Sequence, residues 1–235
     1  MKHERILGVY AHPDDADIGA GGTLAHFAAE GADVAIVVTT LGDAGGYEEE
    51  GHDRISEVRR QEQLDAASAL GIEKVTFLEG YADGDVTVTK ELVRDIVRQI
   101  RTHQPTLVLT MSPVHNWNSV AATHPDHRAV GEATVQAVYP AARNPFAFPE
   151  LLEAGLEPWT VEEIWFQGHQ DPNSHVELTK EDVESKVEAV SKHISQFQDL
   201  DRMRGHVLRM VSESAAESGL PEGSFAERFF VYKTN

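Results

Sequence analysis

The chain has 235 residues, no cysteine and a formal net charge of −19 at pH 7. The lack of cysteine excludes disulfides, thiolate metal sites and cysteine nucleophiles, and the acidity argues against binding to nucleic acid or anionic membranes. The length suits a single α/β domain over residues 1–235. No apolar run approaches the roughly 20 residues that span a bilayer, and the N-terminus resembles a first strand rather than a signal peptide, so we expect a cytoplasmic protein.

The first half of the chain alternates predicted strands and helices. The apolar, strand-like segments are 5–10, 33–40, 74–80 and 106–111, and the segments with helical spacing are 22–31, 56–71 and 89–103. This alternation predicts a mostly parallel, Rossmann-like sheet with helices on both faces, a three-layer αβα fold.

The second half continues the pattern less regularly. We predict helices at 124–138, 181–197 and around 205–217, strands at 161–168, 176–179 and 228–233, and a connector or flap at 144–159. The glycine-rich, acidic segment 41–53 is predicted to be a loop, with 45–53 as a candidate lid.

Two clusters of histidine and aspartate follow predicted strands. His12, Asp14, Asp15 and Asp17 come directly after the strand at 5–10, and the segment "HPDH", with His124, Asp126 and His127, lies beyond the strand at 106–111. In parallel sheets, ligand sites lie beyond the carboxyl ends of the strands. We therefore expect the clusters to be neighbours in space, although they are far apart in sequence.

Together the clusters supply what an open metal site needs, three nitrogen or oxygen ligands and a free position for water. His12 and Asp15 are three residues apart, as are His124 and His127, a spacing that points both side chains of a pair the same way in a helical turn. The spacing does not choose between His124 and His127. A neighbouring acid such as Asp14 is free to take a proton from a metal-bound water, and Asp126 is suited to hold a histidine ring in one tautomer.

A purely structural explanation also fits each cluster alone, because a His-Pro-Asp turn can end a strand and aspartates cap helices. The occurrence of two such clusters, each at the carboxyl end of a predicted parallel strand, favours chemistry.

The segments "AHPDD", "IGAGGTLA" and "HPDH" together resemble the PIG-L/LmbE-like zinc-dependent N-deacetylase family. The segment "RRQEQLDAASALGI" is similar to a helix of that family through Arg59 and Glu62. One departure is Asp43, where members often carry glutamate.

The resemblance implies roles for individual residues. It implies that His12, Asp15 and His127 bind zinc, that Asp14 is the general base, that His124 stabilises the oxyanion or protonates the leaving amine, and that Asp126 orients His124. The implied reaction removes the acetyl group from a small N-acetylglucosamine derivative. Sites with two histidines and one aspartate also accept iron(II) or cobalt, and a homo-oligomer is compatible with the family.

Two other functions remain to be weighed. A dinucleotide-binding oxidoreductase would use "GAGGT" as a phosphate loop, but acids intervene after the strand and the second strand has no following acid for a ribose hydroxyl. Gly19, Gly21 and Gly22 are better explained by close packing at a helix start. The second alternative is a non-catalytic metal- or ligand-binding module. The complete set of base, acid and ligands in the sequence argues against it, because such a module would not need that set.

Some residues outside the clusters have weaker signals. Arg54, Arg59 and Arg60 are expected on a solvated helix face rather than at a substrate. Trp117 is a candidate to stack on a sugar and His115 to line the pocket, whereas Trp165 is expected in the core.

Overall fold

The computed structural model describes residues 3–46 and 52–234 and is built around a seven-stranded sheet with the order β3-β2-β1-β4-β5-β7-β6. The strands are β1 (Arg5–Tyr10), β2 (Asp33–Val38), β3 (Lys74–Phe77), β4 (Leu107–Met111), β5 (Glu163–Gln167), β6 (Ser174–Leu178) and β7 (Phe225–Lys233). The first five pair in parallel, whereas β7 runs antiparallel to both β5 and β6. The predicted mostly parallel α/β fold is confirmed.

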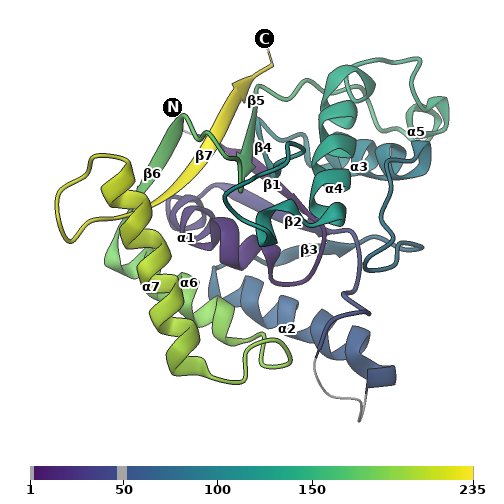
Figure 1. Cartoon of the computed structure of the whole chain (residues 1–235). Coiled ribbons are helices and arrows are strands. Elements are labelled where there is room, and N and C mark those ends of the chain that lie inside the picture. The colour runs from purple at the N-terminus through teal and green to yellow at the C-terminus, as the bar shows by residue number, and fades with distance from the viewer. Residues whose placement is uncertain (1–2, 47–51, 235) are drawn as a thin grey trace.

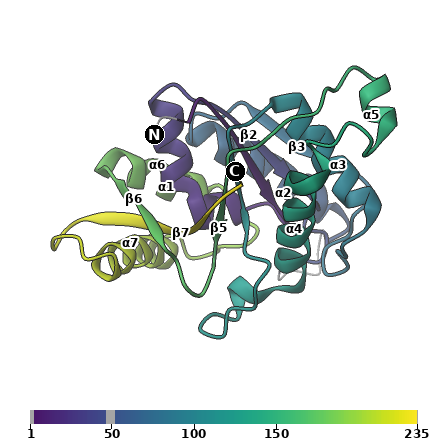
Figure 2. The same cartoon turned by 90° about the horizontal axis from the view of Figure 1, so that it is seen from above.

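Helices cover both faces of the sheet (Figures 1 and 2). They are α1 (Asp15–Ala29), α2 (Ile55–Ala69), α3 (Lys90–His103), α4 (Pro125–Gln136), α5 (Pro149–Glu153), α6 (Lys180–Ser191) and α7 (Leu200–Glu217), with short helical turns η1 (His52–Arg54), η2 (Ala121–Thr123) and η3 (Ala137–Ala141). The alternation of β1 divides the core: Leu7 and Val9 pack toward α3 and α4, and Ile6 and Tyr10 pack toward α1 and α2.

Helix α1 begins seven residues earlier than the sequence predicted. Gly19, Gly21 and Gly22 therefore lie inside the helix and not at its start. A Cβ at Gly19 would come within 2.2 Å of the Gln167 side chain, and a Cβ at Gly22 within 2.5 Å of Leu178. The glycines do serve close packing, as predicted, and the early start places Asp15 in the first helical turn.

The two C-terminal helices also differ from their predicted bounds. Helix α6 ends at Ser191 rather than continuing to residue 197. Helix α7 begins at Leu200 because the carboxylate of Asp199 caps it by accepting the N–H of Arg202 at 2.9 Å. Of the candidate lid at 45–53, residues 47–51 lie outside the described residues.

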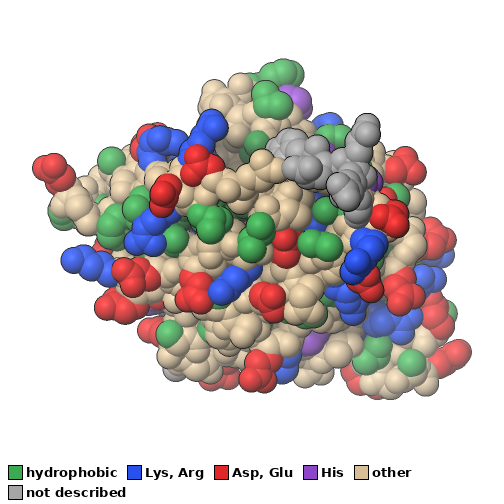
Figure 3. Space-filling model, turned by 90° about the horizontal axis from the view of Figure 1, so that it is seen from below, with side chains coloured by type: hydrophobic (Ala, Val, Ile, Leu, Met, Phe, Trp, Pro, Cys, Tyr) green, Lys and Arg blue, Asp and Glu red, His purple; other side chains and the backbone are tan. Residues whose placement is uncertain are grey.

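The surface is charged but not divided into large single-sign areas on the face seen from below, where acidic and basic side chains are interspersed (Figure 3). Within residues 3–46 and 52–234, no helix has both the length and the apolar character required to cross a bilayer.

Candidate metal centre and active site

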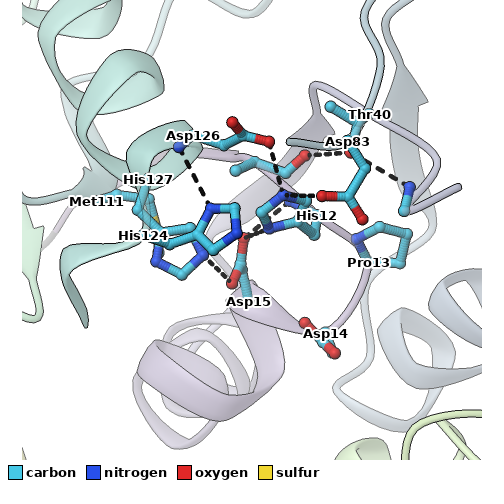
Figure 4. Close-up of polar contacts among 12 residues, drawn as sticks. His12, Pro13, Asp14, Asp15, Thr40, Asp83, Met111, His124, Asp126 and His127 are labelled. Atoms are coloured by element: carbon cyan, nitrogen blue, oxygen red, sulfur yellow. Dashed lines mark hydrogen bonds and ion pairs between the residues drawn. The ribbon is translucent and has the colours of Figure 1, made fainter. Parts of the chain in front are cut away.

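The two clusters meet at the carboxyl edge of the sheet. Strands β1 and β4 are parallel neighbours, so the loop after Tyr10 and the segment after Met111 leave the same edge. His12 and Asp15 come from the first, and the "HPDH" side chains come from the start of α4 (Figure 4). The expected juxtaposition of the two clusters is present in the structure.

The carboxylate of Asp15 lies between two imidazole rings. Its Oδ2 is 3.4 Å from Nδ1 of His12 and its Oδ1 is 3.1 Å from Nε2 of His127. Oδ2 also accepts the backbone N–H of His12 at 2.8 Å, which fixes the carboxylate against the loop. Burial alone would raise the pKa of Asp15, but the facing rings of His127 and His12 hold that pKa well below its usual range. The carboxylate is therefore held as an anion.

These side chains have the donor chemistry of an open zinc site. Ring nitrogens of His12, His124 and His127 lie within 4.8 Å of one another, and Asp15 adds a carboxylate oxygen between two of the rings. Nε2 of His12 faces the carboxylates of Asp83 and Asp126, so Nδ1, which faces Asp15, is the ring nitrogen that would give up its proton to bind a cation. Two imidazole nitrogens and one carboxylate oxygen fit a divalent cation with one position open.

Asp126 contacts His12 at Nε2, the ring nitrogen opposite the one that faces Asp15. Its Oδ2 is 3.0 Å from Nε2 of His12, and the same carboxylate accepts the backbone N–H groups of Gly84 at 2.7 Å and Val86 at 3.3 Å. The Asp126 side chain is fully buried. A carboxylate bonded to the far nitrogen of a ligating histidine fixes the tautomer and orientation of the ring.

The contact predicted between the Asp126 carboxylate and His124 is made with His12 instead. His124 is contacted by the backbone of Asp126, whose N–H donates to Nδ1 at 3.3 Å. Nδ1 is thus an acceptor, which leaves the proton of the neutral ring on Nε2. Burial and the neighbouring rings of His12 and His127 lower the pKa of His124, so the neutral ring is favoured.

Asp14 adjoins the cluster at the N-cap position of α1. Its backbone is in the left-handed region, with φ of 100°. The carboxylate is 3.3 Å from the Nη2 of Arg59. Burial and the charge of Asp15 raise the pKa of Asp14 to about 6, although Arg59 opposes the shift. Figure 4 shows Asp14 next to Asp15 but outside the contacts that join the rings.

The sequence predicted that Arg59 lies on a solvated helix face, but in the structure its side chain is buried. It is 4% exposed, and its guanidinium donates to the carbonyl oxygens of Pro13 at 2.7 Å and Gly42 at 3.0 Å. Arg59 lies on the buried side of α2 together with Glu62 and Gln63. Arg59 thus ties the first cluster to the loop after β2.

Two residues that contact the cluster were not singled out by the sequence analysis. Gln63 lies one turn after Arg59 on the buried side of α2 and accepts the N–H of Asp14 at 2.8 Å. Asp83 follows β3 in a turn, and its Oδ1 is 3.0 Å from Nε2 of His12. With Asp126 and Asp15 it raises the pKa of His12 to about 12, against the effect of burial. Gln63 could have been found from its helical spacing to Arg59, and Asp83 from the Asp-Gly turn that follows a predicted strand.

Comparison with known proteins gives consistent matches. A model of the PIG-L family, described as GlcNAc-PI de-N-acetylase, matches residues 7–138. The chain is 33% identical over 196 residues to diacetylchitobiose deacetylase from Thermococcus kodakarensis, an alignment that spans 83% of this chain and 70% of that protein. It is also 33% identical over 192 residues to 1D-myo-inositol 2-acetamido-2-deoxy-alpha-D-glucopyranoside deacetylase from Rhodococcus erythropolis, spanning 68% of this chain and 62% of that relative.

A solved structure shares the architecture. The N,N'-diacetylchitobiose deacetylase from Pyrococcus horikoshii, in complex with its inhibitor MPG, superposes with a TM-score of 0.88 at 27% identity, covering 98% of this chain and 84% of that one. The segment matched by the family model contains both clusters, from His12 to His127. The chain belongs to the PIG-L family of de-N-acetylases.

Proposed function

We propose that this protein is a zinc-dependent hydrolase that removes the acetyl group from a small N-acetylglucosamine derivative. The observation that carries the proposal is the Asp15 carboxylate set between the rings of His12 and His127, with Asp14 and His124 beside it. The relatives that are named deacetylases of N-acetylated sugars support the same reaction.

His12, Asp15 and His127 would hold the metal. Two nitrogens and one oxygen without sulfur suit zinc, and iron(II) or cobalt suits the same set. When bound by these residues, such an ion would supply Lewis-acid polarisation of the acetamide carbonyl and would lower the pKa of a water. Asp126 holds the ring of His12 through Nε2, so Nδ1 is the ring nitrogen that would be offered to the metal.

Asp14 is the proposed general base. It takes a proton from the attacking water and can return that proton to the leaving nitrogen as the C–N bond breaks, which gives acetate and a free amine. Its position depends on α2, since Gln63 and Arg59 contact its backbone and carboxylate.

His124 is the proposed stabiliser of the oxyanion. With Nδ1 occupied by the N–H of Asp126, its Nε2–H is available to donate to negative charge that develops on the carbonyl oxygen. Of the two roles implied by the family resemblance, this tautomer supports oxyanion stabilisation rather than protonation of the amine.

The test is a screen of N-acetylated amino sugars for release of acetate by the 235-residue chain, with and without a chelator. We expect chelator-sensitive release from at least one N-acetylglucosamine derivative, restored by added zinc. Acetate release that is indifferent to the chelator would overturn the metal-dependent mechanism, and no release from any of these sugars by zinc-loaded protein would overturn the proposed activity.

A further inference from the structure

His193 is a buried imidazole that lies outside the metal centre and has no part in the proposed reaction. It follows the C-terminal end of α6, and its carbonyl accepts the N–H groups of Gln196 and Phe197, each at 3.0 Å, which fixes its backbone in a tight turn. Its side chain is fully buried, although the next residue, Ile194, is 64% exposed. An imidazole that a surface turn directs into the interior needs a polar partner there.

The partner of His193 is the carboxylate of Asp17 in the first turn of α1. Nε2 of His193 is 2.9 Å from Oδ2 of Asp17, and neither side chain is exposed to solvent. The same Oδ2 accepts the side-chain amide of Gln63 at 3.0 Å. The other oxygen, Oδ1, has no hydrogen-bond partner among the residues that the structure describes. His193 and Gln63 therefore fix the position of this carboxylate through one oxygen.

The carboxylate of Asp17 sets the orientation of the Gln63 amide. A glutamine amide has one acceptor oxygen and one donor NH₂ group, whereas an ionised carboxylate only accepts. Nε2 of Gln63 is therefore turned toward Asp17, and Oε1 is turned toward the backbone N–H of Asp14, which it accepts at 2.8 Å. The reversed amide would place oxygen against oxygen at Asp17 and N–H against N–H at Asp14.

Helix α6 holds these contacts at a fixed position relative to α1. The two helices pack together (Figure 1). The buried ammonium of Lys186, about two turns before His193, donates to the backbone carbonyls of Asp17 at 3.1 Å and Ile18 at 2.5 Å. Lys186 thus fixes the backbone of the first turn of α1, and His193 fixes the Asp17 carboxylate that projects from that turn.

We infer that His193 is a positioning residue for Asp14 and acts through Asp17 and Gln63. The inference rests on the proposed function, in which Asp14 is the general base. Asp14 has a φ of 100°, so the direction of its carboxylate depends on the contacts that hold its backbone. Without His193, the buried carboxylate of Asp17 keeps one neutral donor. The Gln63 amide is then free to turn, and the N–H of Asp14 loses its fixed acceptor.

NMR of the zinc-loaded 235-residue chain tests the first contact without any substrate or variant. Because the carboxylate of Asp17 only accepts, Nε2 of His193 must carry a proton. We expect a signal from this proton that is protected from exchange with solvent, as its full burial requires. A His193 ring without a protected proton on Nε2 would overturn the proposal.

Hydrogen exchange at the backbone amide of Asp14 tests the other end of the chain of contacts. The variants are His193→Gln, whose amide nitrogen stands near the position of Nε2 and reaches Asp17, and His193→Asn, whose amide ends near the position of Nδ1. We expect the Asp14 amide to exchange at least about tenfold faster in His193→Asn than in His193→Gln. The reference for opening of the whole fold is the amide of Thr39, which donates to Tyr10 in the sheet at 2.8 Å. Equal exchange of Asp14 in the two variants, relative to Thr39, would overturn the proposal.

Acetate release from N,N'-diacetylchitobiose tests the consequence for turnover. We expect kcat to fall at least about tenfold in His193→Asn, with KM and zinc content within about twofold of the unmodified values, and to recover to within about threefold in His193→Gln. The double variant with Gln63→Leu should lose no more than Gln63→Leu alone, because both residues act through one chain of contacts. Additive losses would overturn the proposal.

Ser195→Ala is the matched control, since it removes a hydrogen bond of 2.7 Å from the same turn to Glu62 of α2. It should keep the unmodified kcat, and a loss equal to that of His193→Asn would overturn the specific role of His193. If the unmodified protein releases no acetate from any N-acetylated amino sugar, the proposed function fails. The two NMR measurements then still decide whether His193 positions Asp14.

Discussion

The backbone N–H of Asp14 donates to the side-chain Oε1 of Gln63 at 2.8 Å, which ties the proposed general base to the buried side of α2. The Nε2 of Gln63 in turn donates to Asp17 at 3.0 Å. Asp14 has a φ of 100°, a conformation that costs a non-glycine residue on the order of 1–3 kcal/mol and persists only where the surroundings impose it. The Gln63 side chain is one of the groups that hold Asp14 in this conformation.

Gln63→Leu should therefore impair catalysis without removing a ligand. The change leaves the N–H of Asp14 without its acceptor, which should lower the free energy of unfolding by about 1–3 kcal/mol. We expect kcat to fall about tenfold to a hundredfold, with zinc content and KM nearly unchanged. The control is Gln61→Leu, at an exposed position of the same helix. Normal kcat in Gln63→Leu would show that α2 does not position Asp14.

Removal of the carboxylate of Asp14 should separate metal binding from turnover. Asn tolerates the left-handed backbone, so Asp14→Asn should fold and retain zinc, measured by metal analysis of the purified protein. Its kcat should fall about 10²- to 10⁴-fold because general-base catalysis is lost. Turnover close to that of the unmodified protein would mean that Asp14 is not the base.

Removal of the His124 side chain and removal of the His127 side chain should have opposite effects on metal retention. Because Nε2 of His127 faces Asp15 at 3.1 Å, His127→Ala should lose the metal. His124→Ala should keep the metal and lose about 10²- to 10³-fold in kcat, as expected for an oxyanion donor. Metal analysis and acetate release on the two variants check this assignment, and the reverse pattern would exchange the two roles.

Asp126→Asn should weaken metal binding although Asp126 is not a proposed ligand. The carboxylate fixes His12 through Nε2 at 3.0 Å, and loss of such a supporting partner lowers metal affinity about 10- to 100-fold. Competition with a chelator of known affinity measures the effect. Asp85→Asn, at an exposed position near the contacted Gly84, is the matched control. Equal zinc affinity in both variants would contradict the supporting role.

His193 should stabilise the fold mainly at low pH. Burial acts to lower the pKa of His193, but the hydrogen bond and charge of Asp17, at 2.9 Å, outweigh it and raise that pKa. A raised pKa in the folded state contributes stability that is complete below the unfolded value of about 6.5 and is lost as pH rises through the folded value. The stability difference between the unmodified protein and His193→Asn should thus be larger at pH 5.5 than at pH 9, measured by urea unfolding. A difference that grows with pH would contradict the Asp17 pairing.

The sequence was sufficient to predict the sheet and the meeting of the two clusters. The strand that ends at Tyr10 and the one that ends at Met111 are mostly apolar and almost entirely buried, and parallel strands bring their carboxyl ends to one edge. Helix α1 was predicted to begin too late because its glycines resemble a loop, whereas in the fold they make room for Gln167 and Leu178.

The sequence pattern could not predict which side chains contact one another when they are far apart in the sequence. Nothing in "HPDH" says that the carboxylate of Asp126 bonds His12 rather than His124, because that depends on how α4 meets the loop after β1. Asp83 carries no motif and reaches His12 only through the turn after β3. Arg59 was misplaced because an arginine among polar residues has the sequence pattern of a solvated face.

The most direct measurement is acetate release from N,N'-diacetylchitobiose by the purified chain after metal removal and after stepwise return of zinc. If the His12, Asp15 and His127 side chains form the working centre, activity should be absent from the stripped protein and reach its maximum at about one zinc per chain. Full activity in the stripped protein, or none at any zinc level with any N-acetylated amino sugar, would contradict the account.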